Sequence, residues 1–263
     1  MQPLSTGRYR VRLAQSERDL AAAQALRGRV FRTGAATDRD DFDAICRHVL
    51  VEDGQDRLMC CFRLLPLPGG AAIGTSYSAQ FYDLAALSAF AAPMIEVGRF
   101  CLAPGCHDPD VLRLAWGALA SEVAAQDAGM LFGCSSFHGL DWRAYADCFA
   151  ALAGRHLAPE RWRPQAKAPQ LVHYAQALAG QIPDLRRAQL TMPPLLRSYL
   201  AMGGWVSDHA VVDEDLGTLH VFTGLEIAAI PPARARVLRM GAVPVSGAGS
   251  AGAGPIDVCG ARL

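Results

Sequence analysis

The stretch from Met94 to Phe137, MIEVGRFCLAPGCHDPDVLRLAWGALASEVAAQDAGMLFGCSSF, decides the fold. Its apolar start, Met94–Leu102, is predicted to be a strand. A helix is predicted after the following loop, because Asp108 can serve as its N-cap, apolar residues recur at helical spacing, and Gly129 can cap its C-terminus. A second apolar strand, Met130–Phe137, ends the stretch. Strand, crossover helix and strand of this length are typical of a parallel strand pair in an α/β or α+β protein.

Two charges stand inside the first of these strands. Glu96 and Arg99 are three positions apart, so on a regular strand their side chains point to opposite faces of the sheet. Charged side chains are rarely buried without a partner. The strand is therefore expected to contain a bulge, an ion pair or a polar site at this point.

Composition limits the class of protein. The chain has 263 residues, half of them hydrophobic, and a formal net charge of zero, which favours a globular protein and argues against a nucleic-acid partner. The eight cysteines match no zinc or redox spacing and are expected to be reduced, core-filling thiols; no metal is predicted. The sequence contains no apolar run of about 20 residues, so a soluble protein, at most peripheral to a membrane, is expected.

The remaining elements follow from periodicity and turn residues. Further strands are expected at residues 8–13, 46–52, 58–65, 171–174 and 219–227, with a hairpin through Asp53-Gly54. Helices are expected from Ser16 to Phe31, at residues 81–90, after Asp141, and at residues 195–202. Residues 241–263 are rich in Gly, Ala, Ser and Pro and are expected to form a mobile tail.

A cluster of acids, at positions 38, 40, 41 and 43, occupies the loop after the first helix. It is either a solvated, helix-capping loop or a cation site for a metal or a substrate ammonium, although the glycine of a calcium loop is missing. Arg27 on the preceding helix would ordinarily be solvated, since most arginines are exposed. A second charge cluster, at residues 155–167, is basic and is either a wet surface loop or a docking surface for an acidic partner.

Taken together, the unusual charges resemble, in order and local spacing, the signature of the acyl-homoserine-lactone synthases, which are amine-acylating members of the GNAT-type N-acyltransferase superfamily. The matching residues are Arg27 with Phe31, Asp40 with Asp43, Arg63 in FRLLP, and Glu96 with Arg99 in EVGRF. The chain is more similar still to the L-ornithine Nα-acyltransferases of ornithine-lipid synthesis. That resemblance spans about Tyr9 to Ile230 and is carried by DDFDAICRHVLVED, IEVGRFCL, LFGCSSFHG and PPLLRSYLAMGGWVSDHAVVDEDLG. The tryptophan that lactone synthases carry after Phe31 is absent, and the chain continues past their usual end, which favours the ornithine branch.

The resemblance implies a GNAT fold of the α+β (α/β) class, with a central mixed, splayed sheet flanked by helices. The acyl thioester would lie between the strands at residues 95–102 and 130–137. Residues 1–240 would form one domain, whose part from about residue 171 extends beyond the lactone-synthase-like core.

The loop APGCHDPD lacks the Gln/Arg-x-x-Gly-x-Gly/Ala turn with which acetyl-CoA users of the superfamily hold a pyrophosphate. An acyl chain on the 4′-phosphopantetheine of acyl-carrier protein is therefore the expected donor, with no bound cofactor. A cytoplasmic location is expected, with the inner membrane as a further point of peripheral contact.

The resemblance also implies an activity, formation of an amide between the α-amine of an amino acid, foremost ornithine, and a (3-hydroxy)acyl thioester. Glu96 would be the general base and Arg99 its catalytic partner, with backbone amides of that strand holding the oxyanion. Tyr145 is a candidate general acid, although a lone helix aromatic is more often a core residue. Substrate binding is assigned to Arg27, Phe31, Asp40, Asp43 and Arg63, and carrier-protein docking to Arg155, Arg161, Arg163 and Lys167. The arginines at 27, 63 and 99 are expected to form ion pairs with the acidic loop or to bind the substrate carboxylate.

Three other classes remain open at this stage. They are a lactone synthase that uses S-adenosylmethionine, a CoA-dependent N-acyltransferase, and a GNAT-like binding module without catalysis. A serine hydrolase is not expected, because GCSSFHG is not the Gly-x-Ser-x-Gly elbow.

Overall fold

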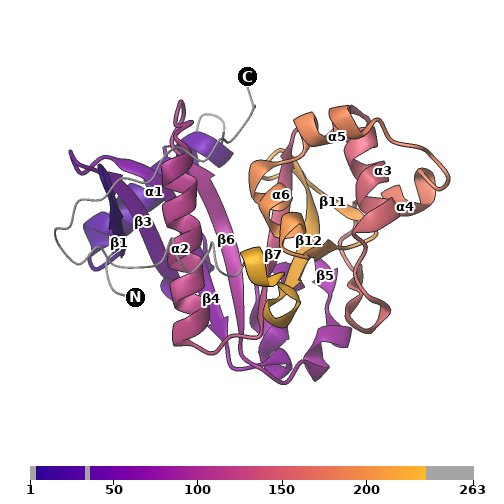
Figure 1. Ribbon diagram of the computed structural model, residues 1–263, viewed down its shortest axis with the longest axis horizontal. Coiled ribbons are helices and arrows are strands. Elements are labelled where there is room, and N and C mark those ends of the chain that lie inside the picture. Colours follow the sequence, from indigo (N-terminus) through magenta and orange to yellow (C-terminus); the bar gives the residue numbers. More distant parts are fainter. Residues whose placement is uncertain (1–3, 33–35, 235–263) are drawn as a thin grey trace.

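The computed structural model describes residues 4–32 and 36–234, so the tail predicted at 241–263 lies outside the described residues (Figure 1). A mixed ten-stranded sheet runs through the molecule in the order β1-β2-β3-β4-β6-β7-β12-β11-β9, with β10 paired to β12. The strands are β1 Leu4–Thr6, β2 Tyr9–Leu13, β3 Arg47–Asp53, β4 Leu58–Leu67, β6 Met94–Leu102, β7 Met130–His138, β9 Leu171–Val172, β10 Trp205–Val206, β11 Ala210–Asp213 and β12 Thr218–Glu226. A small separate sheet joins β5 Tyr82–Asp83 to β8 Gln165–Ala166.

Helices cover both faces of the sheet. They are α1 Glu17–Phe31, α2 Pro109–Ala125, α3 Ala146–Arg155, α4 Tyr174–Ala177, α5 Leu185–Thr191 and α6 Pro194–Ala201. In Figure 1, α1 and α2 lie with β1–β4 and β6 in one half of the molecule, and α3–α6 lie with β7, β11 and β12 in the other. The hydrophobic core is divided between the two faces of the sheet, because neighbouring residues of a strand point to opposite faces. Val49 and Phe62 share a cluster with residues of α2, whereas Leu50 and Cys61 share one with residues of α1.

The predicted crossover unit is confirmed. β6 and β7 run parallel, α2 connects them, and the Asp108 carboxylate caps the helix by accepting from the Asp110 amide at 3.0 Å. The C-cap prediction was wrong, because the helix ends at Ala125 and Gly129 lies beyond it. Gly129 instead permits a close approach, since a Cβ there would stand 2.7 Å from that of Ala92.

The two central strands pair over a short distance and then separate. Met94–Glu96 pairs with Met130–Phe132, and no β6–β7 pair follows in the described chain, whereas β7 stays paired with β12 along its whole length. Gly133 lies at the point of divergence. A Cβ on it would stand 2.3 Å from the Val97 carbonyl oxygen, so only glycine allows the strands to meet this closely before they part.

The predicted irregularity in β6 is confirmed as a bulge. Arg63 and Cys61 of β4 pair with Gly98 and Cys101 of β6, so three steps along β6 match two along β4. Arg99 occupies the extra position with a φ of +52°, a left-handed conformation that is unusual outside glycine. The bulge changes the alternation, so that Arg99 points to the same face of the sheet as Glu96.

Two other local predictions need correction. Residues 81–90 form β5 and a 3-10 turn at Ala85–Ala89 rather than a helix. The strand predicted at 171–174 ends at Val172, after which α4 begins. The predicted β3–β4 hairpin is confirmed, with a connection of four residues in which Asp56 has the left-handed conformation.

The seven cysteines of the described chain are all free thiols, as predicted from their spacing.

Candidate active site

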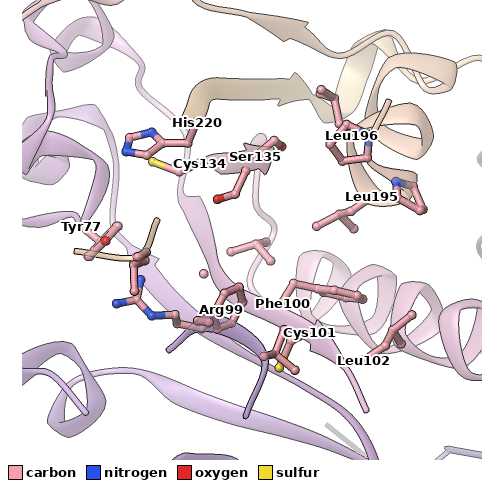
Figure 2. Close-up of a pocket in the computed structure, with 18 of the residues that line it drawn as sticks. Tyr77, Arg99, Phe100, Cys101, Leu102, Cys134, Ser135, Leu195, Leu196 and His220 are labelled. Atoms are coloured by element: carbon pink, nitrogen blue, oxygen red, sulfur yellow. The ribbon is translucent and has the colours of Figure 1, made fainter. Parts of the chain in front are cut away.

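A cavity of about 390 Å³ lies where β6 and β7 separate (Figure 2). Figure 2 shows Tyr77, Arg99 and His220 at one end of it and Leu195 and Leu196 at the other. The polar lining side chains are Tyr77, Glu96, Arg99, Ser135, Ser136, Asp213 and His220, and the larger apolar ones are Phe31, Phe100, Leu102, Leu112, Leu195, Leu196 and Leu216. The end with Tyr77, Arg99 and His220 is the polar end, and the end with Leu195 and Leu196 is the apolar end.

These two ends lie on opposite faces of the sheet. Glu96 shares its face with Met94, which packs in the cluster that contains Tyr82, while Val97 packs in the cluster of α2. On the other side of the opening, Ser135 and Cys134 are neighbours on β7 and therefore point to opposite faces. The cavity is therefore lined by side chains from both faces of the sheet.

Glu96 is buried at the polar end, with only 4% of its surface exposed. Its Oε1 accepts from the Ser78 amide at 2.7 Å and from the Ser78 hydroxyl at 2.6 Å, and its Oε2 accepts from the Tyr77 amide at 2.8 Å. Burial raises the pKa of Glu96 above the usual glutamate value, although the hydrogen bonds from Ser78 and Tyr77 oppose the rise. The side chain is thus fixed in direction and is a stronger base than an exposed glutamate.

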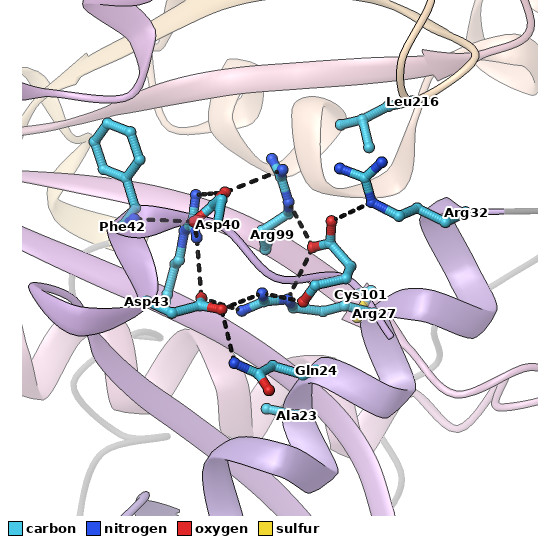
Figure 3. A network of polar contacts seen from close by, with 12 residues as sticks. Ala23, Gln24, Arg27, Arg32, Asp40, Phe42, Asp43, Arg99, Cys101 and Leu216 are labelled. Atoms are coloured by element: carbon cyan, nitrogen blue, oxygen red, sulfur yellow. Dashed lines mark hydrogen bonds and ion pairs between the residues drawn. The ribbon is translucent and has the colours of Figure 1, made fainter. Parts of the chain in front are cut away.

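A network of alternating charges lies beside the cavity (Figure 3). It contains four guanidinium groups and four carboxylates, those of Arg27, Arg32, Arg63 and Arg99 and of Asp38, Asp40, Asp43 and Asp215. The expectation that the scattered arginines meet the acidic loop is therefore confirmed.

Arg27 is the centre of this network, with 1% of its surface exposed rather than solvated as its helix alone suggested. Its guanidinium donates to Asp43 at 2.7 and 2.8 Å and to Asp38 at 3.0 Å. Burial acts to raise the pKa of Asp43, but the bonds from Arg27 hold it well below its usual value. Removing one partner from such a buried pair costs about 3–5 kcal/mol, because it leaves the other charge buried without compensation.

Arg99 joins the network to the cavity. Its Nε donates to Asp38 at 2.9 Å and its Nη2 to Asp40 at 3.2 Å. Its guanidinium also lies 4.9 Å from the centre of the Tyr77 ring. Burial raises the pKa of Tyr77 to about 12, opposed by the charge of Arg99, so the phenol is protonated at neutral pH. Arg99 and Tyr77 thus bring a fixed positive charge and a hydroxyl donor to the polar end.

His220 brings an unprotonated nitrogen to the same end. The Tyr82 hydroxyl donates to the His220 carbonyl oxygen at 2.8 Å, so its 3.0 Å contact with Nδ1 requires the proton on Nδ1. Nε2 is then an acceptor, and it is buried with no hydrogen-bond partner among the residues that the structure describes. Burial lowers the pKa of His220 to about 3, and the ring is neutral at physiological pH.

Cys134 also lines the cavity, but burial raises the pKa of its thiol to about 12. Nucleophilic attack by cysteine needs the thiolate. The thiol of Cys134 is therefore protonated at neutral pH and is not an activated nucleophile.

The residues predicted to act in catalysis and substrate binding fall into three groups: those that line the cavity, those that form the network beside it, and Tyr145. Glu96, Arg99 and Phe31 line the cavity, whereas Arg27, Arg63, Asp40 and Asp43 form the network beside it. The Tyr145 hydroxyl donates to the His138 carbonyl oxygen at 2.8 Å, and the residue is not among those that line the cavity.

In the basic segment, Arg155, Arg161 and Lys167 are exposed and Arg163 is half-buried. Arg161 pairs with Glu226 at 3.1 Å and the Lys167 ammonium donates to the Ala79 carbonyl oxygen at 2.6 Å. The catalytic, binding and docking roles of all these residues stay predictions.

Relatives of known function match most of the chain. The L-ornithine Nα-acyltransferase of Rhodobacter capsulatus is 34% identical over 87% of this chain and 92% of its own length. That of Agrobacterium fabrum is 30% identical over 85% of this chain and 83% of its own. The chain belongs to the L-ornithine Nα-acyltransferase family.

A model of the acetyltransferase (GNAT) domain matches residues 13–117 of this acyltransferase, a segment that includes α1, β3, β4 and β6. Among solved structures, an N-acyl amino acid synthase from uncultured soil microbes aligns with 85% of this chain and 94% of its own at 9% identity, with a TM-score of 0.49. Within residues 4–32 and 36–234, no helix of the acyltransferase is long and apolar enough to cross a membrane.

Sequence reasoning missed several polar groups of the acyltransferase site, namely those of Tyr77, Ser78, Asp213 and His220. Tyr77 and Ser78 belong to a short irregular segment with no periodic pattern, and its Ser-Tyr-Ser composition alone does not indicate a site. Asp213 and His220 reach the cavity only because β12 pairs with β7. The polar VSDH and VVDE stretches around these strands were the one available signal.

Proposed function

We propose that this protein transfers a (3-hydroxy)acyl chain from acyl-carrier protein to the α-amine of L-ornithine, as a step of ornithine-lipid synthesis. One observation carries the proposal, the cavity at the β6–β7 divergence with a buried carboxylate at its polar end and an apolar far end. Membership in the L-ornithine Nα-acyltransferase family supports the choice of acceptor.

The acyl donor would enter from the apolar face. Leu102, Leu112, Leu195 and Leu196 line that end, and apolar surface of this kind suits an acyl chain and its pantetheine arm. The loop between β6 and α2 offers no glycine-rich turn for a pyrophosphate, which favours a carrier protein over CoA. The exposed arginines at 155 and 161 are the proposed contact for the acidic carrier.

The acceptor would enter from the polar face and present its amine to Glu96. A free α-amine is mostly protonated at neutral pH, so it must lose a proton before it can attack. The ammonium first gives one proton to solvent. The neutral amine nitrogen then forms a bond to the thioester carbon, while Glu96 takes a second proton from that nitrogen, directly or through a water. The carbon–sulfur bond then breaks, and the pantetheine sulfur leaves as a thiol with the proton that Glu96 took up.

The developing oxyanion needs donors at the same place. In the part of the chain that the structure describes, β6 pairs with β7 only as far as Glu96, so the backbone groups beyond Glu96 that point away from β4 have no strand partner. The proposal assigns the oxyanion to backbone amides of this edge. Arg99, held by Asp38 and Asp40, supplies positive charge nearby for the acceptor carboxylate.

The test is a product assay. Purified protein is incubated with 3-hydroxyacyl-carrier protein, or with the matching CoA thioester, and with a panel of amino acids, and the amides are identified by mass. The proposal expects Nα-acylornithine from the carrier-bound donor. Product from the CoA thioester alone would overturn the donor assignment, and product from another amino acid but none from ornithine would overturn the acceptor.

The product of this reaction carries one acyl chain and a charged head. Such an amphiphile partitions to a lipid surface, so peripheral contact with the inner membrane from the cytoplasmic side is part of the proposal.

A further inference from the structure

We propose that Asp213 binds the cationic side chain of the acceptor amino acid, which for ornithine is its δ-ammonium. The inference rests on the proposed function, because it concerns the acceptor of that reaction. In this proposal, the preference for an amino acid with a cationic side chain over one with an uncharged side chain comes from a single carboxylate, which lies on the opposite side of the cavity from β6.

The position of Asp213 follows from strand register. It ends β11 and pairs with Thr218 of β12, while Val211 pairs with His220. Paired residues of antiparallel strands share a face, and so do residues two apart on one strand. Asp213 therefore lies on the same face as His220, and both line the cavity. Only 7% of Asp213 is exposed.

The carboxylate lacks a counter-ion. Its Oδ1 accepts from the Leu216 amide at 3.0 Å and closes the β11–β12 turn. Among residues 4–32 and 36–234, no arginine, lysine or histidine pairs with it, whereas Asp38, Asp40 and Asp43 each pair with arginine. A buried carboxylate without a cation is costly. A cationic ligand would remove that cost.

The charge of Asp213 reaches the residues at the polar end. It acts to raise the pKa of both Tyr77 and Cys134, and the charge of Glu96 also acts to raise the pKa of Cys134. The polar end thus contains two carboxylates on different strands, Glu96 on β6 and Asp213 on β11. The reacting amine must lie beside the β6 edge, so Glu96 is assigned to it and Asp213 remains for a second ammonium.

Substrate competition tests this assignment. L-Norvaline has the carbon skeleton of ornithine without the δ-amine, so the two compounds differ only in the group that Asp213 is proposed to bind. In Asp213→Asn the charge is removed, but the oxygen that accepts from Leu216 is kept. The neighbouring Glu214 is exposed, and Glu214→Gln is the matched control for loss of one negative charge.

Wild type and Glu214→Gln are expected to prefer ornithine. Asp213→Asn is expected to lower kcat/KM for ornithine about 10- to 100-fold, mainly through KM, and to leave norvaline acylation unchanged. Retained norvaline acylation also shows that the variant is folded.

Two outcomes would overturn the inference while leaving the proposed function intact. One is an unchanged kcat/KM for both amino acids in Asp213→Asn, and the other is an equal fold loss of kcat/KM for both, which would assign Asp213 to the turn alone. Wild type that acylates neither amino acid would overturn the proposed function, and this inference with it.

Discussion

The carboxylates of Asp38, Asp40 and Asp43 and those of Glu96 and Asp213 lie on one face of the same sheet, in two different settings. The first three are surrounded by guanidinium groups, which hold the pKa of Asp38 and Asp43 below the usual value even though burial acts to raise it. Glu96 is held by amides and a hydroxyl instead, and burial raises its pKa.

The difference separates carboxylates that position other side chains from carboxylates that can react with a substrate. A carboxylate that already has its cations is fixed in charge and can position neighbouring groups. A carboxylate that has donors but no cation can still take up a proton or an ammonium. The arginine network should therefore control stability, and the cavity carboxylates should control activity.

The largest expected effect is on turnover. Glu96→Gln removes the base and keeps the size of the side chain, so kcat should fall about 10²- to 10⁴-fold. Steady-state kinetics with circular dichroism on the same sample would check this. A folded variant with near-normal kcat would place the base elsewhere and remove the distinction drawn between the two settings.

The next effect is on stability. Arg27→Met keeps an apolar stem but leaves Asp38 and Asp43 without their central partner, so the free energy of unfolding should fall by about 3–5 kcal/mol. Urea titration would measure it, with Arg29→Met, exposed on the same helix, as the control. Equal values for the two variants would show that the network contributes no net stability.

The pH dependence should have opposite signs in the two settings. The folded-state pKa of Asp43 is lowered, so its contribution to stability is present above the unfolded value of about 3.9 and is lost as pH falls through the lower folded value. The folded-state pKa of Glu96 is raised, so its contribution is present below about 4.3 and is lost as pH rises through the folded value.

Unfolding curves against pH for wild type, Asp43→Asn and Glu96→Gln would show both signs. The free energy of unfolding of wild type should exceed that of Asp43→Asn by less as the pH falls. The free energy of unfolding of wild type relative to that of Glu96→Gln should decrease as the pH rises. Activity should fall on the acid side at a higher pH than an ordinary glutamate would give. Parallel curves for all three proteins would contradict the comparison.

The smallest effect is expected from exposed arginines, whose interactions with a partner are screened by solvent and salt. Reversing Arg155 and Arg161 to Glu should raise KM for carrier-bound donor several-fold at low salt, without changing KM for the amino acid. Lys167 is left intact because its ammonium holds the Ala79 carbonyl beside the Glu96 donors. Reversal of Arg18 and Arg29, both exposed on α1, is the control. An equal response of the two double variants would leave residues 155–167 without a docking role.

The sequence was most informative where charged residues stand at positions that are normally apolar, because such residues must find partners in the fold. Two charges in an apolar strand indicated a bulge, an ion pair or a polar site, and the structure has a bulge at Gly98 and Arg99 together with ion pairs from Arg99. The meeting of Arg27 with the acidic loop followed from a family signature, since the helix alone favoured solvation.

Groups that arrive through tertiary pairing were not predictable from the sequence. The amides of Tyr77 and Ser78 bind Glu96 through a 3-10 segment whose spacing resembles no motif. Asp213 belongs to a strand that reaches the cavity through two neighbouring strands. The same limit explains residues 81–90, where apolar spacing fits a helix and a 3-10 turn equally well.

The left-handed backbone at Arg99 has a consequence for the order in which the molecule assembles. Such a conformation costs of order 1–3 kcal/mol for a residue with a side chain, and here the side chain that makes it costly also makes the bonds to Asp38 and Asp40 that offset it. Until the acidic loop is in place, a regular strand is the lower-energy state for residues 94–102. We therefore expect the bulge of β6 and the ion pairs of Arg99 to form together during folding, so that a partly folded chain without the acidic loop in place lacks this edge of the cavity.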